Sequence, residues 1–179
     1  MKATGIVRRI DDLGRIVIPK EIRRTLRIRE GDPLEIYTDS EGEVIFKKYS
    51  PVGELSSFAT SYSEVISKTS GVPTLISDRD HIVSAAGVSK REFVERRITP
   101  ATEELMESRR TYNSFENNYP LQPVEGIDSP AMLVYPIISA GDVTGSVIML
   151  CSDNKTVPSE ADIKLAQSAS SFLGKQMEE

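Results

Sequence analysis

The first fifty residues contain the sequence signals of four strands and a helix, which is more secondary structure than a segment of this length can pack around a core of its own. Asp11 and Gly14 bound a turn between two short segments rich in β-branched residues, as in a strand pair. Pro19 follows at once and suits the first turn of a helix, which should end near Gly31. The predicted order is a strand pair, a helix and a second strand pair, at residues 4–10 and 15–18, 20–26, and 34–39 and 43–49.

A unit of this size has too little core to be stable as a monomer. It contains no cysteine and no cluster of metal-ligating side chains that could staple it. Oligomerisation is the remaining common remedy. The sequence therefore predicts an obligate dimer, with strands of the two chains interleaved.

Charge is distributed unevenly along the chain. The net charge is −5, yet residues 1–29 carry +6, so residues 30–179 carry −11. Such asymmetry favours a polyanion-binding segment joined to an acidic domain, although a solvated basic surface is the alternative. The basic residues of the first segment are Lys2, Arg8, Arg9, Arg15, Lys20, Arg23, Arg24, Arg27 and Arg29.

Arginines dominate one face of the predicted helix. With 100° between successive residues, Ile22 and Leu26 share one face while Arg23, Arg24 and Arg27 gather on the other. Two-fold symmetry would double this set and the arginines of the preceding strand pair. Guanidinium groups suit both phosphate contact and bidentate contact with guanine edges, so the pattern favours double-stranded DNA as the partner.

Residues 51–53 are predicted to be a linker, followed by a second domain at residues 54–179. Apolar residues at helical spacing open this domain between Leu55 and Ile66. Two apolar strands, 131–139 and 143–152, precede a closing helix with Ser159 as its N-cap. This order predicts an α+β fold. Any pocket between its layers could be lined by aromatic residues, namely Phe93, Tyr112, Phe115, Tyr119 and Tyr135.

Residues for chemistry are sparse. A single cysteine, Cys151, excludes an intrachain disulfide, and one histidine, His81, excludes a zinc site of several His and Cys ligands. We expect both to be structural, with no catalytic site, cofactor or metal. The charged N-terminus is not typical of a secretory signal, and no segment has the roughly 20 apolar residues that span a bilayer. A cytoplasmic protein without membrane contact is expected.

The run from Thr4 to Tyr49 resembles the swapped-hairpin DNA-binding domain of AbrB-type transition-state regulators. The resemblance spans nearly all of residues 1–50 and rests on a strand, the Asp-x-Leu-Gly-Arg turn, a second strand and the Pro-x-x-x-Arg-Arg helix. It implies two chains that exchange strands to form one dimer. The residues in the family's DNA-contacting positions are Arg8, Arg15, Arg23 and Arg24, with Arg9 and Lys2 as further phosphate contacts.

The remainder resembles a GAF-type domain. An AbrB-type domain followed by a GAF-type domain is similar to the domain order of sporulation regulators of endospore-forming bacteria. This resemblance implies activation or repression of late forespore-stage genes. It also implies a homotetramer in which the C-terminal domains pair through helices. Whether this domain senses a small-molecule effector or only oligomerises stays open. The alternative is an antitoxin or interaction module, because AbrB-type domains also occur in antitoxins and the C-terminal region could bind a protein.

Overall fold

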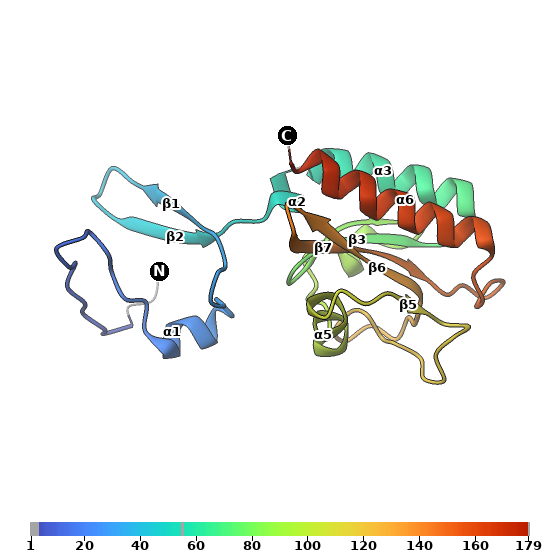
Figure 1. Cartoon of the computed structure of the whole chain (residues 1–179), viewed down its shortest axis with the longest axis horizontal. Helices are drawn as coiled ribbons and strands as arrows, with labels where there is room; N and C mark the ends of the chain where they lie inside the picture. The colour runs from blue at the N-terminus through green and yellow to red at the C-terminus, as the bar shows by residue number, and fades with distance from the viewer. Residues whose placement is uncertain (1–3, 55, 179) are drawn as a thin grey trace. The chain divides into compact units, whose positions relative to one another are not determined.

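The chain folds into two units, Met1–Tyr49 and Ser50–Glu179. The structure, a computed structural model, describes residues 4–54 and 56–178, except for the side chain of Glu54. Figure 1 shows the helices and strands of both units. The boundary between the units falls near residue 50, where the sequence predicted it. The arginines predicted to contact DNA therefore all belong to the N-terminal unit.

Within residues 4–49, the regular structure of the N-terminal unit consists of one short helix and one strand pair. Helix α1 spans Lys20–Thr25, and strands β1 (Leu34–Thr38) and β2 (Val44–Lys48) form an antiparallel hairpin. The Asp39 carboxylate closes this hairpin by accepting hydrogen bonds from the backbone N–H groups of Glu41 and Glu43, at 3.0 and 2.9 Å. This part of the prediction is confirmed.

The first predicted strand pair differs from the structure. Residues 4–10 and 15–19 are irregular and form no ladder within the chain. Only the turn between them closes, through hydrogen bonds from Asp11 N to Arg15 O at 3.0 Å and from Gly14 N to Asp11 O at 3.1 Å. Apart from half-buried Ile18, their β-branched side chains are exposed, so these residues have no neighbouring strand within the described part of a single chain.

The C-terminal unit is a five-stranded antiparallel sheet with helices on both faces. The strand order is β4-β3-β7-β6-β5. Helices α3 and α6 cover one face side by side, and α5 lies on the other (Figure 1). The strands are β3 (Thr74–Asp78), β4 (Ile82–Ala86), β5 (Tyr112–Asn113), β6 (Ala131–Ser139) and β7 (Asp142–Leu150). The helices are α2 (Pro51–Glu54), α3 (Ser56–Ser70), α4 (Lys90–Phe93), α5 (Pro100–Glu107) and α6 (Glu160–Gln176).

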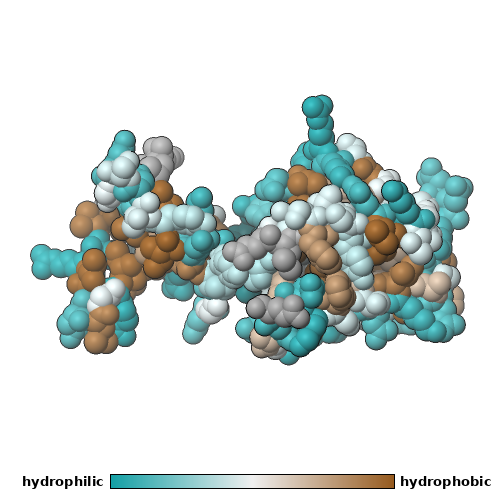
Figure 2. Space-filling view, turned by 90° about the horizontal axis from the view of Figure 1, so that it is seen from above, coloured by the Kyte–Doolittle hydropathy of each residue, from teal (hydrophilic) through white to brown (hydrophobic). Residues whose placement is uncertain are grey.

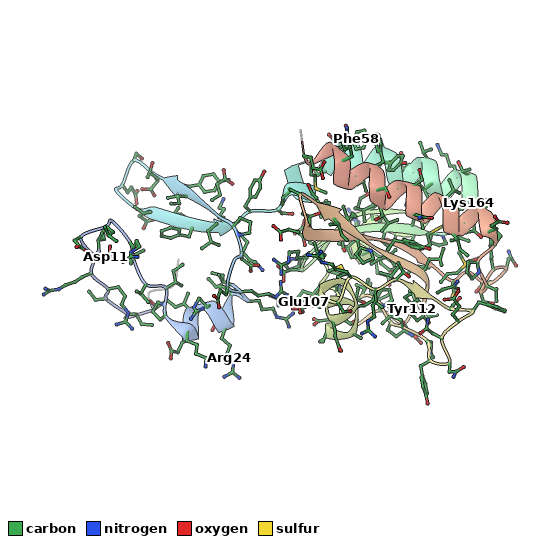
Figure 3. The ribbon with its side chains drawn as sticks, viewed as in Figure 1. Asp11, Arg24, Phe58, Glu107, Tyr112 and Lys164 are labelled. Atoms are coloured by element: carbon green, nitrogen blue, oxygen red, sulfur yellow. The ribbon has the colours of Figure 1, made fainter. Side chains whose placement is uncertain are left out.

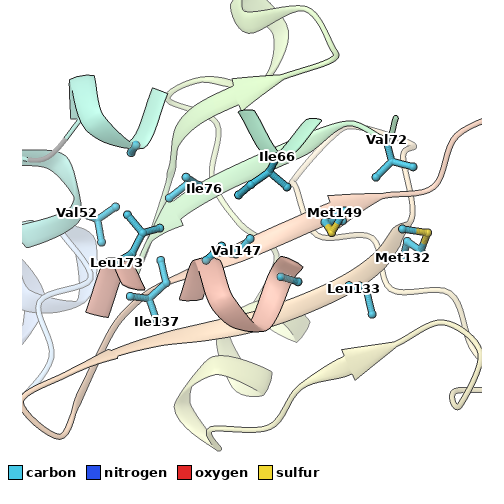
Figure 4. Close-up of a cluster of buried hydrophobic side chains, with 13 residues drawn as sticks. Val52, Ile66, Val72, Ile76, Met132, Leu133, Ile137, Val147, Met149 and Leu173 are labelled. Carbon is cyan, nitrogen blue, oxygen red and sulfur yellow. The ribbon is translucent and has the colours of Figure 1, made fainter. Parts of the chain in front are cut away.

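Two hydrophobic clusters fill the spaces on either side of this sheet. The cluster under α3 and α6 includes Ile66, Val147 and Leu173 (Figure 4). The cluster under α5 includes Met106, Tyr112 and Ile148. Strands with both faces covered lose their alternation, which is why β6 and β7 are continuous apolar runs in the sequence.

The predicted linker at residues 51–53 is wrong. These residues belong to α2, and Val52 is buried in the cluster under α3 and α6. The Ser50 hydroxyl donates to the Asp78 carboxylate at 3.0 Å and accepts from Gly53 N–H at 3.0 Å. Proline and glycine suggested a flexible connection, but Pro51 starts a helical turn and burial of Val52 attaches that turn to the sheet.

Helix α6 begins as predicted, at Ser159. Its hydroxyl accepts the backbone N–H of Asp162, and the Asp162 carboxylate accepts the backbone N–H of Ser159 in return. Lys155 also contacts this carboxylate, at 2.7 Å. Burial raises the pKa of Asp162, but hydrogen bonds from Lys155 and Ser159 outweigh it and hold the pKa below its usual value. The acid is therefore ionised where it caps the helix.

Gly145 permits the closest approach between two central strands. A Cβ atom there would lie 2.0 Å from the carbonyl oxygen of Ser77 on β3. We expect Gly145→Ala to push β3 and β7 apart and to lower the free energy of unfolding by about 3 kcal/mol. Urea unfolding of the full chain, followed by circular dichroism, measures this.

Gly53→Ala is the matched control. The nearest atoms to its new Cβ would be Oγ and Cβ of Ser50, at 3.0 and 3.1 Å, so the side chain of one residue next to a short helix has to shift slightly and no strand backbone is displaced. We expect a change below about 1 kcal/mol there. Equal midpoints for the two variants would contradict the importance of the strand contact.

Candidate nucleic-acid interface

The turn at residues 11–15 holds Arg15 in a defined position. Asp11 is its organising residue, because its Oδ1 accepts the backbone N–H groups of Leu13 and Arg15, at 3.0 and 2.7 Å. Its Oδ2 accepts Nε of Arg15 at 2.8 Å. The guanidinium is thus fixed at one edge, and its two remaining nitrogens lie on the opposite edge of the planar group.

The same contacts account for the electrostatics of Asp11. Hydrogen bonds from the backbone and then the side chain of Arg15 hold the pKa of this carboxyl below its ordinary value. Asp11 is the functional residue that sequence reasoning assigned only to a turn. The available signal was its spacing, since an aspartate four residues before an arginine across a glycine turn favours such a contact.

Helix α1 presents arginines in its last turn. Arg24 is exposed and points away from the helix into solvent (Figure 3), whereas Arg23 is half-buried. Arg27 ends the helix in the left-handed region with a φ of 51°, and its carbonyl accepts Nζ of Lys48 at 2.9 Å. Arg23 and Arg24 therefore occupy the final turn, where cations also interact favourably with the helix dipole.

The structure separates the predicted arginines into two groups along the chain. Arg8 and Arg9 precede the turn and Arg15 follows it, and all three are exposed. Arg23 and Arg24 come from α1. Lys2 lies outside the described residues. The arrangement supplies exposed guanidinium groups on a turn and on a helix end, which suits contact with phosphates and base edges.

Apolar side chains of the N-terminal unit are left uncovered. Within residues 4–49, Pro19 is the single buried residue. Val7 is 85% exposed, and Figure 2 shows apolar surface over much of this unit. Such exposure is unusual in a soluble monomer. The other large apolar residues exposed here are Ile6, Ile10, Leu13, Ile16, Val17, Leu26, Ile36, Tyr37, Val44, Phe46 and Tyr49.

A second uncovered surface lies on the outer side of α3 and α6. Phe58 and Phe172 are exposed, and with Tyr62 they form a cluster whose ring centroids lie 5.5–5.9 Å apart. Val65, also on α3, is 57% exposed and adds apolar surface to that of the rings. Phe58 projects from the top of this layer in Figure 3. We call these four residues the aromatic helix face.

The aromatic residues suggested for an internal pocket do not line one. Phe93 and Tyr112 are buried in the cluster under α5, while Phe115 and Tyr119 are 76% and 84% exposed. Tyr135 packs on the opposite side of the sheet, against the other cluster. Bulky side chains such as Met106 and Ile148 occupy the layer between α5 and the sheet, where the sequence left a pocket and a packed core as alternatives.

Other predicted features occupy ordinary positions. His81 pairs with Arg97 in an isolated β-bridge, and burial raises the pKa of the Cys151 thiol. Within residues 4–54 and 56–178, no three His, Cys, Asp or Glu side chains gather as a metal site would require. In the same residues, no helix has the length and apolar character needed to cross a membrane.

Comparison with known proteins decides the family. The profile of the stage V sporulation protein T C-terminal, transcription factor family matches residues 54–178, and that of antidote-toxin recognition MazE, bacterial antitoxin, matches residues 7–53. Stage V sporulation protein T of Bacillus subtilis (strain 168) is 46% identical over 181 residues, covering 100% of both chains. The chain belongs to the stage V sporulation protein T family.

Each unit of this stage V sporulation protein T family member has its own relatives. The transition state regulatory protein AbrB of Bacillus subtilis (strain 168) is 65% identical over 51 residues, which is 28% of this chain and 52% of AbrB. The GAF domain of an Acinetobacter phosphoenolpyruvate-protein phosphotransferase has a TM-score of 0.55 at 13% identity, covering 73% of this chain and 84% of that domain. The C-terminal unit thus has a GAF fold, and the chain is a sporulation transcription regulator with an AbrB-like N-terminal domain.

Proposed function

We propose that this regulator binds double-stranded DNA selectively through Arg8, Arg15, Arg23 and Arg24, with Arg9 and Lys2 on neighbouring phosphates. The observation that carries the proposal is the set of exposed guanidinium groups of Arg8, Arg15 and Arg24, with half-buried Arg23 beside them, in a domain 65% identical to that of AbrB. Arginine suits this task because its planar fork matches phosphate oxygens and the O6 and N7 atoms of guanine. The bound protein would activate or repress late forespore-stage genes.

The binding unit is a dimer formed by the first 49 residues. A single copy exposes apolar side chains from both the irregular segments and the β1-β2 hairpin. A second copy supplies the missing neighbour if residues 4–10 and 15–18 of each chain pair with strands of the other. This exchange buries the apolar residues and brings two sets of arginines to one DNA duplex.

Two such dimers form a tetramer through the aromatic helix face. Exposed Phe58, Val65 and Phe172 lie on two long helices, α3 and α6, that run side by side in opposite directions (Figure 1), which suits helix-to-helix packing with a second copy. The uneven charge of the chain agrees with these two roles. The basic N-terminal segment binds DNA, and the acidic C-terminal unit forms the contacts between dimers.

The antitoxin alternative is less well supported. Antitoxin tails that wrap a protein partner are short on apolar residues and fold on binding. Here residues 50–179 bury two hydrophobic clusters around a complete sheet. The relationship to stage V sporulation protein T covers the whole chain, whereas the MazE profile matches only residues 7–53.

Salt dependence tests the DNA proposal directly. If a dimer neutralises 6–10 phosphates, the association constant should fall by about 10³–10⁵-fold between 50 and 200 mM salt, because counterions are released. Fluorescence anisotropy with a labelled promoter fragment and a scrambled duplex of equal length measures both affinity and selectivity. Affinity that is independent of salt, or equal for the two duplexes, would refute sequence-selective binding through arginines.

A further inference from the structure

The C-terminal unit carries a groove that includes none of the arginines proposed to contact DNA and no residue of the aromatic helix face. It lies between α5 and the segment 110–117 that follows it, with a volume of about 390 Å³. Volumes of this order accommodate small metabolites. We call it the charged groove, and the residues that matter are Ala101, Glu104, Leu105, Arg110, Glu116 and Asn117.

The charged groove is separate from the hydrophobic core beneath it. Met106 and Tyr112, which lie between the lining residues in sequence, are buried in the cluster under α5. Figure 1 places α5 on the face of the sheet opposite α3 and α6, and the segment 110–117 includes the edge strand β5. The groove is therefore away from the aromatic helix face, and a small molecule could enter it without displacing either the core or a second copy of the chain.

Opposite charges line the groove without pairing to each other. The Nε of Arg110 donates to the Ser108 hydroxyl at 2.9 Å, and this is its one side-chain contact among the described residues. Glu116 accepts only a long hydrogen bond of 3.4 Å, from Asn113. The Glu104 carboxylate has no hydrogen bond or ion pair within the part of the chain that the structure describes, and only the backbone carbonyl of this residue accepts one, from Ser108 N–H.

We propose that the charged groove binds a basic α-amino acid. One guanidinium and two carboxylates give the lining a charge of −1, which a ligand with one carboxylate and two cationic groups complements. Arg110 would take the α-carboxylate through its two terminal nitrogens, and Glu104 and Glu116 would take the α-ammonium and the side-chain cation. Ala101 and half-buried Leu105 provide apolar surface for the methylene chain between them.

The number and sign of the charged groups distinguish a basic α-amino acid from related ligands such as diamines and neutral amino acids. A diamine leaves Arg110 without an anion, and a neutral amino acid leaves one glutamate without a cation. Because each charge that enters a groove loses hydration, an unmatched group on either side weakens binding. The recognition pattern therefore requires all three charged groups in one molecule.

Titration of the full chain with L-lysine, L-lysinamide, cadaverine and L-leucine, followed by isothermal calorimetry, tests the proposal. We expect L-lysine to bind at least about tenfold more tightly than the other three, because each of them lacks one charged group or replaces it. Arg110→Gln should remove the preference of the protein for L-lysine over L-lysinamide. Glu104→Gln should weaken L-lysine without restoring L-leucine to equal strength.

Arg91→Ala is the matched control, since Arg91 is an exposed arginine on α4 outside the groove. It should bind L-lysine as the parent chain does. No heat from L-lysine, equal binding of L-lysine and cadaverine, or an unchanged preference in Arg110→Gln would each overturn the proposal. Circular dichroism and promoter binding of every variant should match the parent chain, so failure of the ligand site is distinguishable from failure of DNA binding.

Discussion

Replacing Arg23 and Arg24 together by alanine will abolish specific DNA binding while leaving the oligomer intact. A dimer loses four guanidinium groups, and each bidentate contact to a base or phosphate contributes on the order of 1–3 kcal/mol. The association constant should therefore fall by at least about 10³-fold, and the dependence of binding on salt should become shallower. Fluorescence anisotropy across a range of salt concentrations measures both.

The test must separate loss of DNA contacts from loss of the folded oligomer. Arg24 is exposed, so its removal leaves no cavity. Arg23 is half-buried, and light scattering shows whether its removal changes the size of the oligomer. Arg91→Ala, which removes an exposed arginine from the C-terminal unit, should bind promoter DNA normally. If the double variant retains promoter affinity with an unchanged salt dependence, α1 does not contact DNA.

Local sequence signals predicted the features that local interactions determine. Ser159 caps α6, as its hydroxyl side chain ahead of the closing helix indicated. The turn at residues 11–14 also forms, because Asp11 and Gly14 satisfy its backbone within five residues. Hydrogen bonds of this kind depend on near neighbours in sequence, so one segment is sufficient to specify them.

Features that depend on distant partners were harder to predict. The β-branched residues around the first turn indicated strands, yet strands require a neighbour that one copy of the chain does not provide. Val52 was assigned to a linker because Pro51 and Gly53 surround it, and only the fold shows the buried space that it fills. The aromatic residues considered for a pocket were similarly ambiguous, since burial of Tyr112 depends on strands far away in sequence.

The residues of the candidate sites also separate into those that sequence patterns identified and those that only the fold brings together. Arginine spacing and resemblance identified the residues proposed to contact DNA, but not the carboxylate of Asp11 that orients Arg15. The charged groove gave no sequence signal, because Glu104, Arg110 and Glu116 form a pattern only when α5 and the next segment fold back on each other.

Disruption of the aromatic helix face has the second large expected effect. The double variant Phe58→Ser, Phe172→Ser replaces two exposed rings whose centroids lie 5.7 Å apart. Because the rings provide much of the apolar area on this face, the proposed tetramer should dissociate into dimers that still bind one DNA site. Sedimentation velocity measures the change in mass, and circular dichroism confirms that the sheet remains folded.

Loss of the tetramer should also weaken binding to DNA that carries two sites. A tetramer delivers its second dimer at a high effective concentration, which raises the overall affinity by about 10²–10⁴-fold over a single dimer. The double variant should lose this advantage on a two-site fragment and keep the parent affinity on a one-site fragment. Val157→Ser, which removes an exposed apolar residue before α6, is the control and should change neither mass nor affinity. A double variant with the parent mass would show that the chains assemble through a different surface.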